Sequence, residues 1–512
     1  MKYSFTVPNL FRKVVPLTVF LVISHALVSV HLWAAHYKFG AQTLTVPDGF
    51  VVEQIAGPPL IDRPIVADFD SDGHLYVAES SGSNDPVEVQ LAEKPHRILR
   101  LTDSDGDGTF DSKTVFADQM MFPEGVLWYR GSVYVSAPPQ IWKLTDKDGD
   151  GVAEEREVWF DAKTLTGCAN DLHGPYAGRD GWIYWCKGSF AEQTYERAHT
   201  DPFVTRAAHI FRRRPEGGEV EPVLNGGMNN PVDVVFSNTG ERFLSSTFLQ
   251  RPSAGEGNRD GLIHAIYGGV YGRENGVLDG HPRTGDLMPV LDHLGPVAPS
   301  GLEYYEGKTL GSNFTGNLFT ALFNLHQVTR YELMPQGASF SSKTSVFLES
   351  DDLDFHPTDV FEDADGSLIV IDTGGWYKLC CPTSQLHKPD VPGGIYRIRK
   401  SGTQLYEDPR GLTLRWGSIT NRKLISLLGD ERPYVVDRAI ETLALRGDKV
   451  ISRLSNSLGN SATDSKVRLN IVWALTKIDS REARQAVRLA LQDSNPDVVQ
   501  AALHSISAWR DK

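Results

Sequence analysis

The chain has 512 residues, with 51 lysines and arginines against 65 aspartates and glutamates, a formal net charge of −14 and a pI near 5.5. That length predicts two or three domains rather than one. The acidic balance excludes nucleic acid and an anionic membrane surface as the main partner, and a 40% hydrophobic content is enough for a large core.

Residues 1–40 differ from the rest of the chain. Lys2, Arg12 and Lys13 precede an uncharged run over residues 14–35. A basic start followed by an apolar run is typical of an export signal, and about 22 residues are also enough to span a bilayer. No clean A-x-A cleavage site follows. A signal peptide and an uncleaved membrane anchor therefore both remain open, and both predict an exported protein, periplasmic or membrane-anchored.

A hairpin pattern recurs from about residue 45 to residue 400. Its clearest copy is PTDVFEDADGSLIVID (357–372), where two apolar runs flank Asp365-Gly366. Strand-like runs joined through Asp-Gly predict a β-hairpin. Related copies begin at Pro64, Pro123, His173, Pro231 and Ser300. The turn glycines fall at 73, 131, 181, 240, 316 and 366, with intervals of 58, 50, 59, 76 and 50 residues.

A second strand signature follows the hairpins. It appears as RILRL (97–101), QIWKL (140–144), HIFRR (209–213) and GIYRIR (394–399). Self-similarity at a period of tens of residues indicates a repeat architecture. About four short strands in each of six units predict a mainly β chain, with a six-bladed β-propeller over residues 45–400.

The strand rhythm stops in residues 401–417, which we interpret as a linker, and a helical period begins in 418–512. Three segments align there through Val435, Val467 and Val498, which are 32 and 31 residues apart. This spacing predicts HEAT-like repeats in which each aligned segment is the second helix of a hairpin. The last unit has no polar capping repeat after it, so we expect a protein partner or further chain to cover it.

Two acidic loops have the spacing of calcium sites. One offers Asp146, Asp148 and Asp150 at positions 1, 3 and 5, with Glu154 at position 9 and Glu157 at position 12. A hard cation needs many oxygens, and a bidentate glutamate commonly completes the shell. The other loop has Asp103, Asp105, Asp107 and Asp111, but Thr114 at position 12. The alternative is that these Asp-Gly runs are only good turns between strands.

The four cysteines leave two alternatives open. In an exported chain Cys168 and Cys186, which bracket the third hairpin, could form a disulfide. Cys380 and Cys381 are adjacent, and a bond between neighbours would strain the peptide. The alternative is that the cysteines are free buried thiols.

Candidate catalytic residues precede the inner strands, because propeller active sites form where those strands and their entry loops meet at the central channel. Histidine is the natural general base near neutral pH, and we favour His173. The full set is Asn170, Asp171 and His173 in the third unit, Asn229 and Asn230 in the fourth, and His356 and Asp359 in the sixth. A second polar cluster lies between units four and five, with His264, Arg273, His281, Arg283, Asp286 and His293. For any one of these residues the alternative is a loop-stabilising hydrogen bond.

Three longer segments resemble a known family. They are DGLIHAIYGGVYG (260–272), APSGLEYYEG (298–307) and HPTDVFEDADGSLIVIDTGGWYKLCCPTSQL (356–386). They resemble the bacterial proteins labelled membrane-bound dehydrogenases, which join an exported propeller to HEAT repeats and commonly to a c-type haem domain. No C-x-x-C-H haem-attachment motif occurs in this chain. The propeller is also similar to that of the quinoprotein glucose/sorbosone dehydrogenases, which bind pyrroloquinoline quinone and calcium.

The quinoprotein resemblance implies a catalytic role for His173 and cofactor binding by Asn229 and Asn230. This sequence departs from that family at the cationic residues that hold the tricarboxylated quinone. An arginine is replaced by Asn229, a lysine position falls near Phe323, and two arginine positions fall at His356 and Thr358. These departures leave the fold intact and place the quinone in doubt.

Two classes of function follow. The first is an exported oxidoreductase that acts on a sugar or related alcohol and passes electrons to a separate acceptor. The second is a non-catalytic scaffold that binds a protein or glycan partner through its propeller and HEAT surfaces. The polar residues at the channel favour the first class, and the missing cations favour the second.

Overall fold

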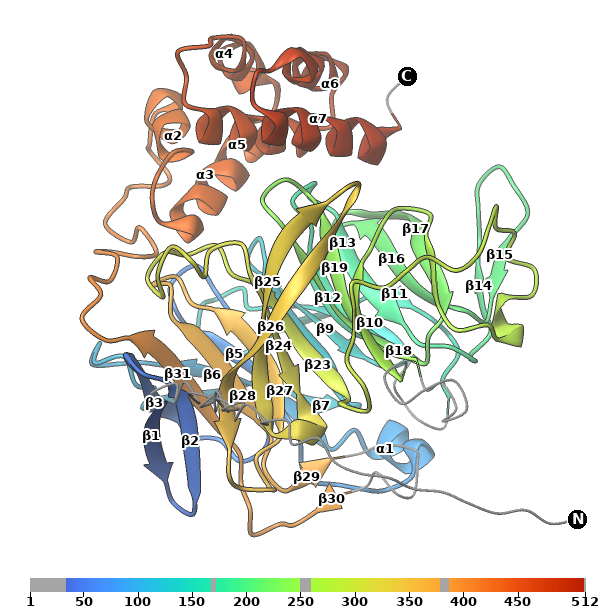
Figure 1. The fold of residues 1–512 in the computed structure, drawn as a ribbon, viewed down its shortest axis with the longest axis vertical. Helices are drawn as coiled ribbons and strands as arrows, with labels where there is room; N and C mark the ends of the chain where they lie inside the picture. Colours follow the sequence, from blue (N-terminus) through green and yellow to red (C-terminus); the bar gives the residue numbers. More distant parts are fainter. Residues whose placement is uncertain (1–33, 167–171, 249–258, 378–385, 511–512) are drawn as a thin grey trace, which may run out of the picture. The chain divides into compact units, whose positions relative to one another are not determined.

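The computed structural model describes residues 34–510 except 167–171, 249–258 and 378–385. Residues 1–33 of the predicted signal or anchor segment, Asn170, Asp171 and three of the four cysteines lie outside the described residues. The described residues form a six-bladed β-propeller followed by helical repeats (Figure 1), which confirms the predicted fold class. Within the described part, no helix has the combination of length and hydrophobicity that crossing a membrane requires.

Each blade is an antiparallel sheet whose first strand lines the central channel, except that the edge strand of blade three, β21, pairs parallel with β17. Blade one comprises β4 (Pro64–Phe69), β5 (Leu75–Glu79), β6 (His96–Thr102) and β7 (Ser112–Met120); blade two comprises β8 (Gly125–Tyr129), β9 (Ser132–Ala137), β10 (Gln140–Thr145) and β11 (Glu155–Asp161). Blade three comprises β12 (His173–Ala177), β13 (Ile183–Lys187), β16 (Ala208–Arg214) and β17 (Gly217–Gly227), with β21 (Val270–Gly272) at its edge. Blade four comprises β18 (Asn230–Phe236), β19 (Arg242–Thr247), β20 (Asp260–His264) and β22 (Asp292–His293).

The last two blades include strands from the start of the chain. Blade five comprises β23 (Pro299–Tyr304), β24 (Leu318–Leu322), β25 (Gln327–Gln336) and β26 (Ser339–Ser350), extended by β2 (Gln42–Pro47) and β1 (Ala34–Phe39). Blade six comprises β27 (Pro357–Glu362), β28 (Leu368–Asp372) and β31 (Gly394–Lys400), and its outermost strand is β3 (Phe50–Ala56). Pairing of β3 with β31 therefore closes the ring of blades. Ala34–Phe39, which the sequence pattern groups with the N-terminal segment, forms a strand of the propeller.

Smaller elements decorate the blades. They are the helix α1 (Val87–Glu93), the hairpins β14 (Gln193–Tyr195) with β15 (Phe203–Thr205) and β29 (Trp376–Tyr377) with β30 (Leu386–His387), and the 3-10 turns η3 (Gly276–Leu278) and η4 (Phe323–Leu325).

The hairpin turns follow the sequence pattern closely. All six predicted turn glycines have positive φ angles, for example +102° at Gly73 and +83° at Gly366. Glycine adopts this left-handed region without the steric cost that a side chain would add. The second strands are the most buried, and β28 is buried at every residue because the neighbouring blades cover both of its faces. Its uninterrupted Leu-Ile-Val-Ile run follows from that double burial.

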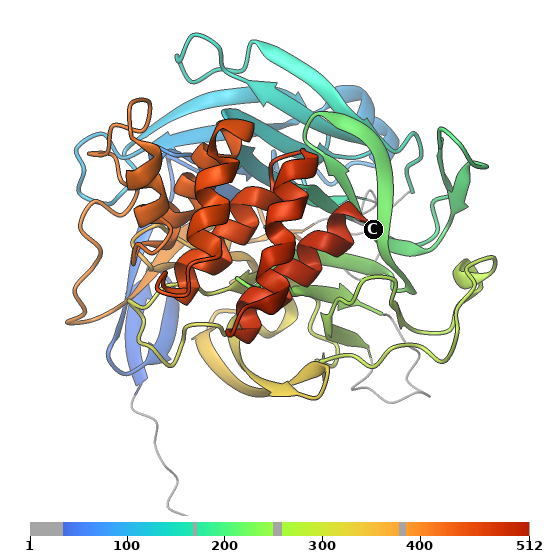
Figure 2. The same cartoon turned by 90° about the horizontal axis from the view of Figure 1, so that it is seen from above.

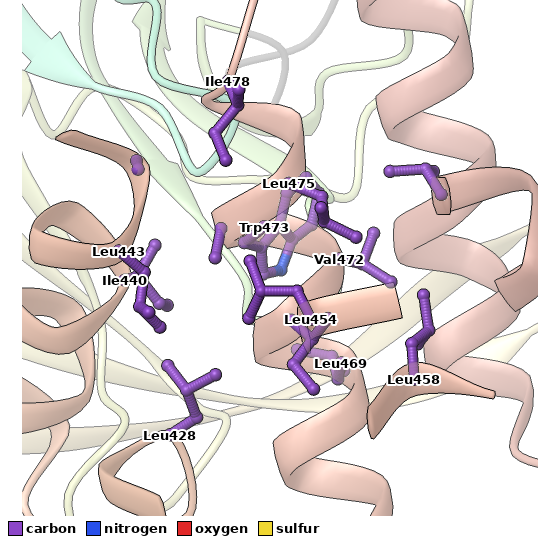
Figure 3. Close-up of a cluster of buried hydrophobic side chains, with 14 of the residues drawn as sticks. Leu428, Ile440, Leu443, Leu454, Leu458, Leu469, Val472, Trp473, Leu475 and Ile478 are labelled. Carbon is purple, nitrogen blue, oxygen red and sulfur yellow. The ribbon is translucent and has the colours of Figure 1, made fainter. Parts of the chain in front are cut away.

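The C-terminal helices form three antiparallel pairs. They are α2 (Asn421–Leu427) with α3 (Pro433–Leu445), α4 (Asp448–Leu458) with α5 (Ser465–Thr476), and α6 (Arg481–Val487), continued by η6 (Arg488–Gln492), with α7 (Pro496–Trp509). The aligned segments are the second helices α3, α5 and α7, as predicted. Their apolar faces pack into one core that includes Leu428, Leu454 and Trp473 (Figure 3).

The second helices of the repeats also contact the propeller. They meet what we call the turn end of the channel, where each inner strand runs into its hairpin turn; the opposite end, where the inner strands begin, is the entry end. Arg179 donates a hydrogen bond of 2.6 Å to Asp437 of α3, and Trp473 Nε1 donates one of 2.7 Å to the Asn238 carbonyl. Figure 2 shows the helices over the middle of the ring of blades. The repeats thus cover the turn end and leave the entry end to the loops of the blades.

Candidate functional site

Carboxyl groups on the inner strands connect neighbouring blades inside the channel. Three backbone amides donate to them: Ala67 N to Asp359 Oδ2 (3.2 Å), Trp128 N to Asp68 Oδ2 (2.7 Å) and Leu302 N to Asp233 Oδ2 (2.8 Å). Inner strands lack ladder partners on their channel side, and these carboxyls satisfy amides that would otherwise lose a hydrogen bond. Asp359, a predicted catalytic residue, is one of these links and joins blade six to blade one.

His173 lies at the entry end, at the start of β12, beside Glu124 of the neighbouring blade. The His173 Nδ1 atom is 3.5 Å from Glu124 Oε2, and both side chains are largely buried. The contact is an electrostatic one rather than a short hydrogen bond; when the imidazole proton is on Nδ1, facing the carboxylate, Nε2 carries the lone pair. His173 Nε2 is fully buried and has no hydrogen-bond partner among the described residues. Burial lowers the pKa of His173 to about 4, so the ring is neutral at pH 7.

His356 lies at the start of the blade-six inner strand. Its backbone amide donates to Asp372 Oδ1 at 2.8 Å, and its Nδ1 atom donates to the Gly374 carbonyl at 2.8 Å. The ring stacks on Phe323, with 4.5 Å between ring centroids. Burial is the main cause of the lowered pKa of His356. His356 is therefore also a neutral imidazole with its lone pair on Nε2.

The predicted asparagines occupy the entry end of blade four. Asn229 Oδ1 accepts a hydrogen bond of 3.1 Å from Arg273, and the Asn229 amide donates to the Thr247 carbonyl at 2.8 Å. Asn230 is the first residue of β18, and its carbonyl accepts from the Ser246 hydroxyl at 3.1 Å. Arg273, from the polar cluster between units four and five, thus belongs to this end of the channel.

The ring order decides which of the candidates can meet. Inner strands contact one another in chain order, and β27 of blade six contacts β4 of blade one. Blades three and six are therefore opposite each other, which places His173 and His356 across the channel. Glu124 was not among the residues predicted from sequence, although it directly precedes β8, as Asn229 directly precedes β18. The pattern could have indicated it.

A cavity of about 820 Å³ runs along the channel. All six inner strands line it, from Glu124 near the entry end to Glu441 and Lys477 of the repeats at the turn end. Arg130 Nη2 lies 2.9 Å from Glu441 Oε2, and Lys477 pairs with the same carboxylate. Ion pairs between the propeller and the repeats thus lie at the turn end of the channel, and Glu124, the neighbour of His173, lines the cavity near its other end.

The acidic loops form two groups of carboxylates outside the channel. Oxygens of Asp146, Asp148, Asp150 and Glu154 lie within 4.8 Å of one another. Glu157 does not belong to this group, because it lies in β11, opposite Lys143, with its carboxylate 3.9 Å from the Lys143 ammonium. Glu154 at position 9 is therefore the glutamate of this loop that faces the three aspartates.

The second acidic loop is smaller. Oxygens of Asp103, Asp105 and Asp107 form its group. Asp111 does not belong to it, since its Oδ1 atom accepts from the Ser104 amide at 3.1 Å and the Ser104 hydroxyl at 2.7 Å. Cys186 is a free, buried thiol, which corresponds to the second of the two alternatives for the cysteines.

A tricarboxylated quinone would have to share several of the described cations near the entry end with protein acceptors. Such a cofactor needs cationic groups with donors to spare. Five of those described already donate to protein acceptors: Arg63 to the Pro389 carbonyl, Arg97 to Glu79, Lys187 to the Gly188 and Ala207 carbonyls, Arg273 to Asn229, and Lys388 to Asp354. The doubt raised by the sequence departures therefore persists in the structure.

Comparison with known proteins gives a family and a set of similar folds. The model of the family described as "Domain of unknown function (DUF7133)" matches residues 38–401, and the HEAT repeats model matches residues 421–507. No curated protein matches the chain.

Three solved structures illustrate the similar folds. A glucose dehydrogenase described as an oxidoreductase, from Thermus thermophilus, is 19% identical over 68% of this chain and 100% of its own, with a TM-score of 0.45. The PQQ domain of pyranose dehydrogenase from Coprinopsis cinerea is 13% identical over 70% and 97%, with a TM-score of 0.45. The PQQ-bound aldose sugar dehydrogenase from Streptomyces coelicolor is 13% identical over 69% and 100%, with a TM-score of 0.44.

Proposed function

Since the chain belongs to the DUF7133 family, whose description assigns no activity, we propose a function from the site itself: a dehydrogenase-like propeller that oxidises a sugar or related alcohol at the entry end of its channel. The His173–Glu124 pair is the observation that carries this proposal. It combines a neutral imidazole, a lone pair on a buried and unpaired Nε2, and a carboxylate behind the other ring nitrogen.

The chemistry assigned to this pair is proton abstraction. His173 Nε2 takes the proton of the substrate hydroxyl. The carbon that bears this hydroxyl loses a hydride to a two-electron acceptor of the quinone class, and a carbonyl group forms. Glu124 positions the ring and stabilises the imidazolium that forms, as a carboxylate does behind a catalytic histidine. Because the sequence lacks cations that hold the quinone in the similar family, and several described cations already donate to protein acceptors, the proposal includes no resident quinone and takes the acceptor as dissociable. The N-terminal segment supports a reaction outside the cytoplasm.

A panel of aldoses and polyols with a soluble quinone-type dye tests this proposal. We expect His173→Gln to lower kcat/KM about a hundredfold or more, because a positioned base contributes roughly that much. Glu124→Gln should lower kcat more than it raises KM. His74→Gln is the matched control, since His74 also pairs with a carboxylate, at 2.9 Å from Asp70, but at the turn end. Full activity in His173→Gln with a substrate that the wild type oxidises would contradict the assignment.

A non-catalytic scaffold is the second candidate, and the engaged cations at the entry end favour it. In that case sugars or glycans would bind without reducing the dye. Calorimetry with the same panel would detect the binding, and the dye assay would show no reduction. A protein partner of the repeats would meet the outer helices α2, α4 and α6, because α3, α5 and α7 already contact the propeller.

We also propose that the loop of Asp146, Asp148, Asp150 and Glu154 binds calcium, because four carboxylates grouped within 4.8 Å repel one another unless a cation neutralises them. A chelator should lower the melting temperature of the wild type, and Asp148→Ala should remove most of that shift. Glu154→Gln should reduce the chelator-induced change in melting temperature. Glu157→Gln lies outside the carboxylate group and should leave that change as in the wild type. If chelator leaves the wild-type melting curve unchanged, the loop is a turn that does not bind calcium.

A further inference from the structure

Five carboxyl groups on the inner strands line the channel cavity without forming an ion pair in the described part of the chain. They are Asp68, Asp233, Glu303, Asp359 and Glu362. The cations that line the turn end are already engaged: Arg130 and Lys477 pair with Glu441, Arg179 pairs with Glu306 and Asp437, and Arg438 packs on the Trp416 ring. The five carboxyls run from the middle of the inner strands, at Asp233 and Asp359, to the turn end, at Asp68, Glu303 and Glu362, and give this part of the cavity wall an excess of negative charge.

Unpaired carboxylates in a poorly solvated site are costly, and such groups either keep their protons or gain a cation. Burial raises the pKa of Asp233 to about 7 and that of Glu362 to about 8. Burial and then the neighbouring Glu362 raise the pKa of Glu303 well above its ordinary value. Near neutral pH, Asp233 and Glu362 are therefore close to the pH at which they lose their protons, so a bound cation could take the place of a proton.

The arrangement of the five carboxyls excludes a compact metal ion as the natural occupant. They come from β4, β18, β23 and β27, and within the described residues only the two acidic loops bring three or more carboxylates within 4.8 Å. Calcium requires six to eight oxygens converging at about 2.3–2.6 Å. Carboxyls spread around and along a channel instead match a long ligand that carries several separated charges.

Other features of the cavity fit such a ligand. The Thr358 hydroxyl oxygen is fully buried, lacks a hydrogen-bond partner among the described residues, and belongs to a residue of the cavity wall. Tyr176, Tyr304 and Phe361 add aromatic surface, which favours both methylene groups and ammonium ions. Leu445 at the end of α3 also lines the cavity and is 69% exposed, so the cavity reaches the surface beside this helix.

We propose that the channel cavity binds a linear aliphatic polyamine, whose ammonium groups pair with Glu303 and the other inner-strand carboxyls and donate to Thr358. The methylene segments would lie along the aromatic wall. This site goes beyond the proposed oxidation at the entry end, since it uses the middle and the turn end of the channel and requires neither His173 nor an electron acceptor.

Isothermal titration of the full chain with spermidine in roughly 150 mM salt at about pH 7 tests the proposal, because that ionic strength screens weak surface pairing. We expect saturable binding with one ligand per chain and net proton release, seen as a heat that changes between buffers of different ionisation enthalpy. Glu303→Gln should weaken binding about tenfold, the effect of losing one charge contact worth about 1.4 kcal/mol. Ala177→Phe, which adds bulk to an exposed cavity-wall residue without removing a carboxyl, should do the same.

The controls separate a built site from general attraction to an acidic protein. Glu349→Gln removes an exposed carboxylate on β26 and should leave affinity unchanged. Magnesium and a neutral polyol of similar length, each added in excess to the wild type, should leave the spermidine affinity unchanged. Equal spermidine affinity in wild type, Glu303→Gln and Ala177→Phe, or binding without proton release, would overturn the proposal. Activity at the entry end is read separately, so either proposal can fail alone.

Discussion

Replacing Trp473 with alanine should lower the free energy of unfolding by about 3–5 kcal/mol, the usual cost of removing a large buried aromatic side chain. Trp473 is 2% exposed and belongs to the core of the helical repeats. It also contacts the propeller, through the 2.7 Å hydrogen bond to Asn238 and through close packing over Gly240. One truncation therefore weakens the repeat core and its contact with blade four together.

Calorimetry and hydrogen exchange would measure this effect. In Trp473→Ala we expect a lower melting temperature, with faster exchange at the Asn238–Gly240 turn as well as in α5. Trp416→Ala is the matched control, because Trp416 is half-buried and hydrogen-bonds within its own loop, from Nε1 to the Gly411 carbonyl at 2.8 Å. Unchanged exchange at the blade-four turn in Trp473→Ala would show that the repeats do not depend on this residue to contact the propeller.

The Asp372 carboxyl should make the protein less stable as the pH rises. Burial raises its pKa from the ordinary 3.8 to about 7. From about pH 4 to pH 7 the unfolded chain has released this proton while the folded chain keeps it, so its contribution to stability is complete below pH 4 and is lost as the pH rises through 7. Between pH 5 and pH 8 this one group should remove roughly 2–3 kcal/mol.

Asp372→Asn isolates this effect. The two backbone amides of His356 and Gly374 both donate to Oδ1, at 2.8 and 2.9 Å, so an asparagine oxygen can accept both and only the titration disappears. Chemical denaturation from pH 5 to pH 8 should give a flatter stability profile for the variant than for the wild type. Asp408→Asn should not flatten it, because the pKa of Asp408 is lowered and its effect falls at more acidic pH. Parallel profiles for wild type and Asp372→Asn would contradict the assignment.

The sequence predicted most of the fold because each hairpin is a local structure. Asp365-Gly366 and its flanking apolar runs specify a turn and two strands within sixteen residues, and the same logic recovers the other blades. The pairing of the repeat helices is similarly local. The contact between Trp473 and the blade-four turn is not local. It joins residues 235 positions apart, and neither segment carries a periodic pattern that would indicate it.

The candidate site was less predictable, for a related reason. The carboxylate of Glu124 lies beside the His173 imidazole, but the two residues belong to different blades, and only the closed propeller brings them together. Asp359 looked like a catalytic group from its place at the channel, and the amide it serves, Ala67, lies 292 residues away. Glu157 matched a ligand spacing, yet strand pairing with Lys143 decides where its carboxylate lies. Predictions of single side chains fail where a distant segment provides the partner.

Closure of the ring by β3 has a consequence for how the chain is made. The strand ends at Ala56, and its partner β31 begins at Gly394, so about 340 residues must be synthesised between them. At about 5–20 residues per second, a ribosome needs roughly 20–70 s for that length. During this interval β3 is an edge strand without its partner, which favours aggregation unless something shields it. The long loop that must close also gives the propeller a high contact order, so we expect slow folding that is completed only after translation has passed blade six.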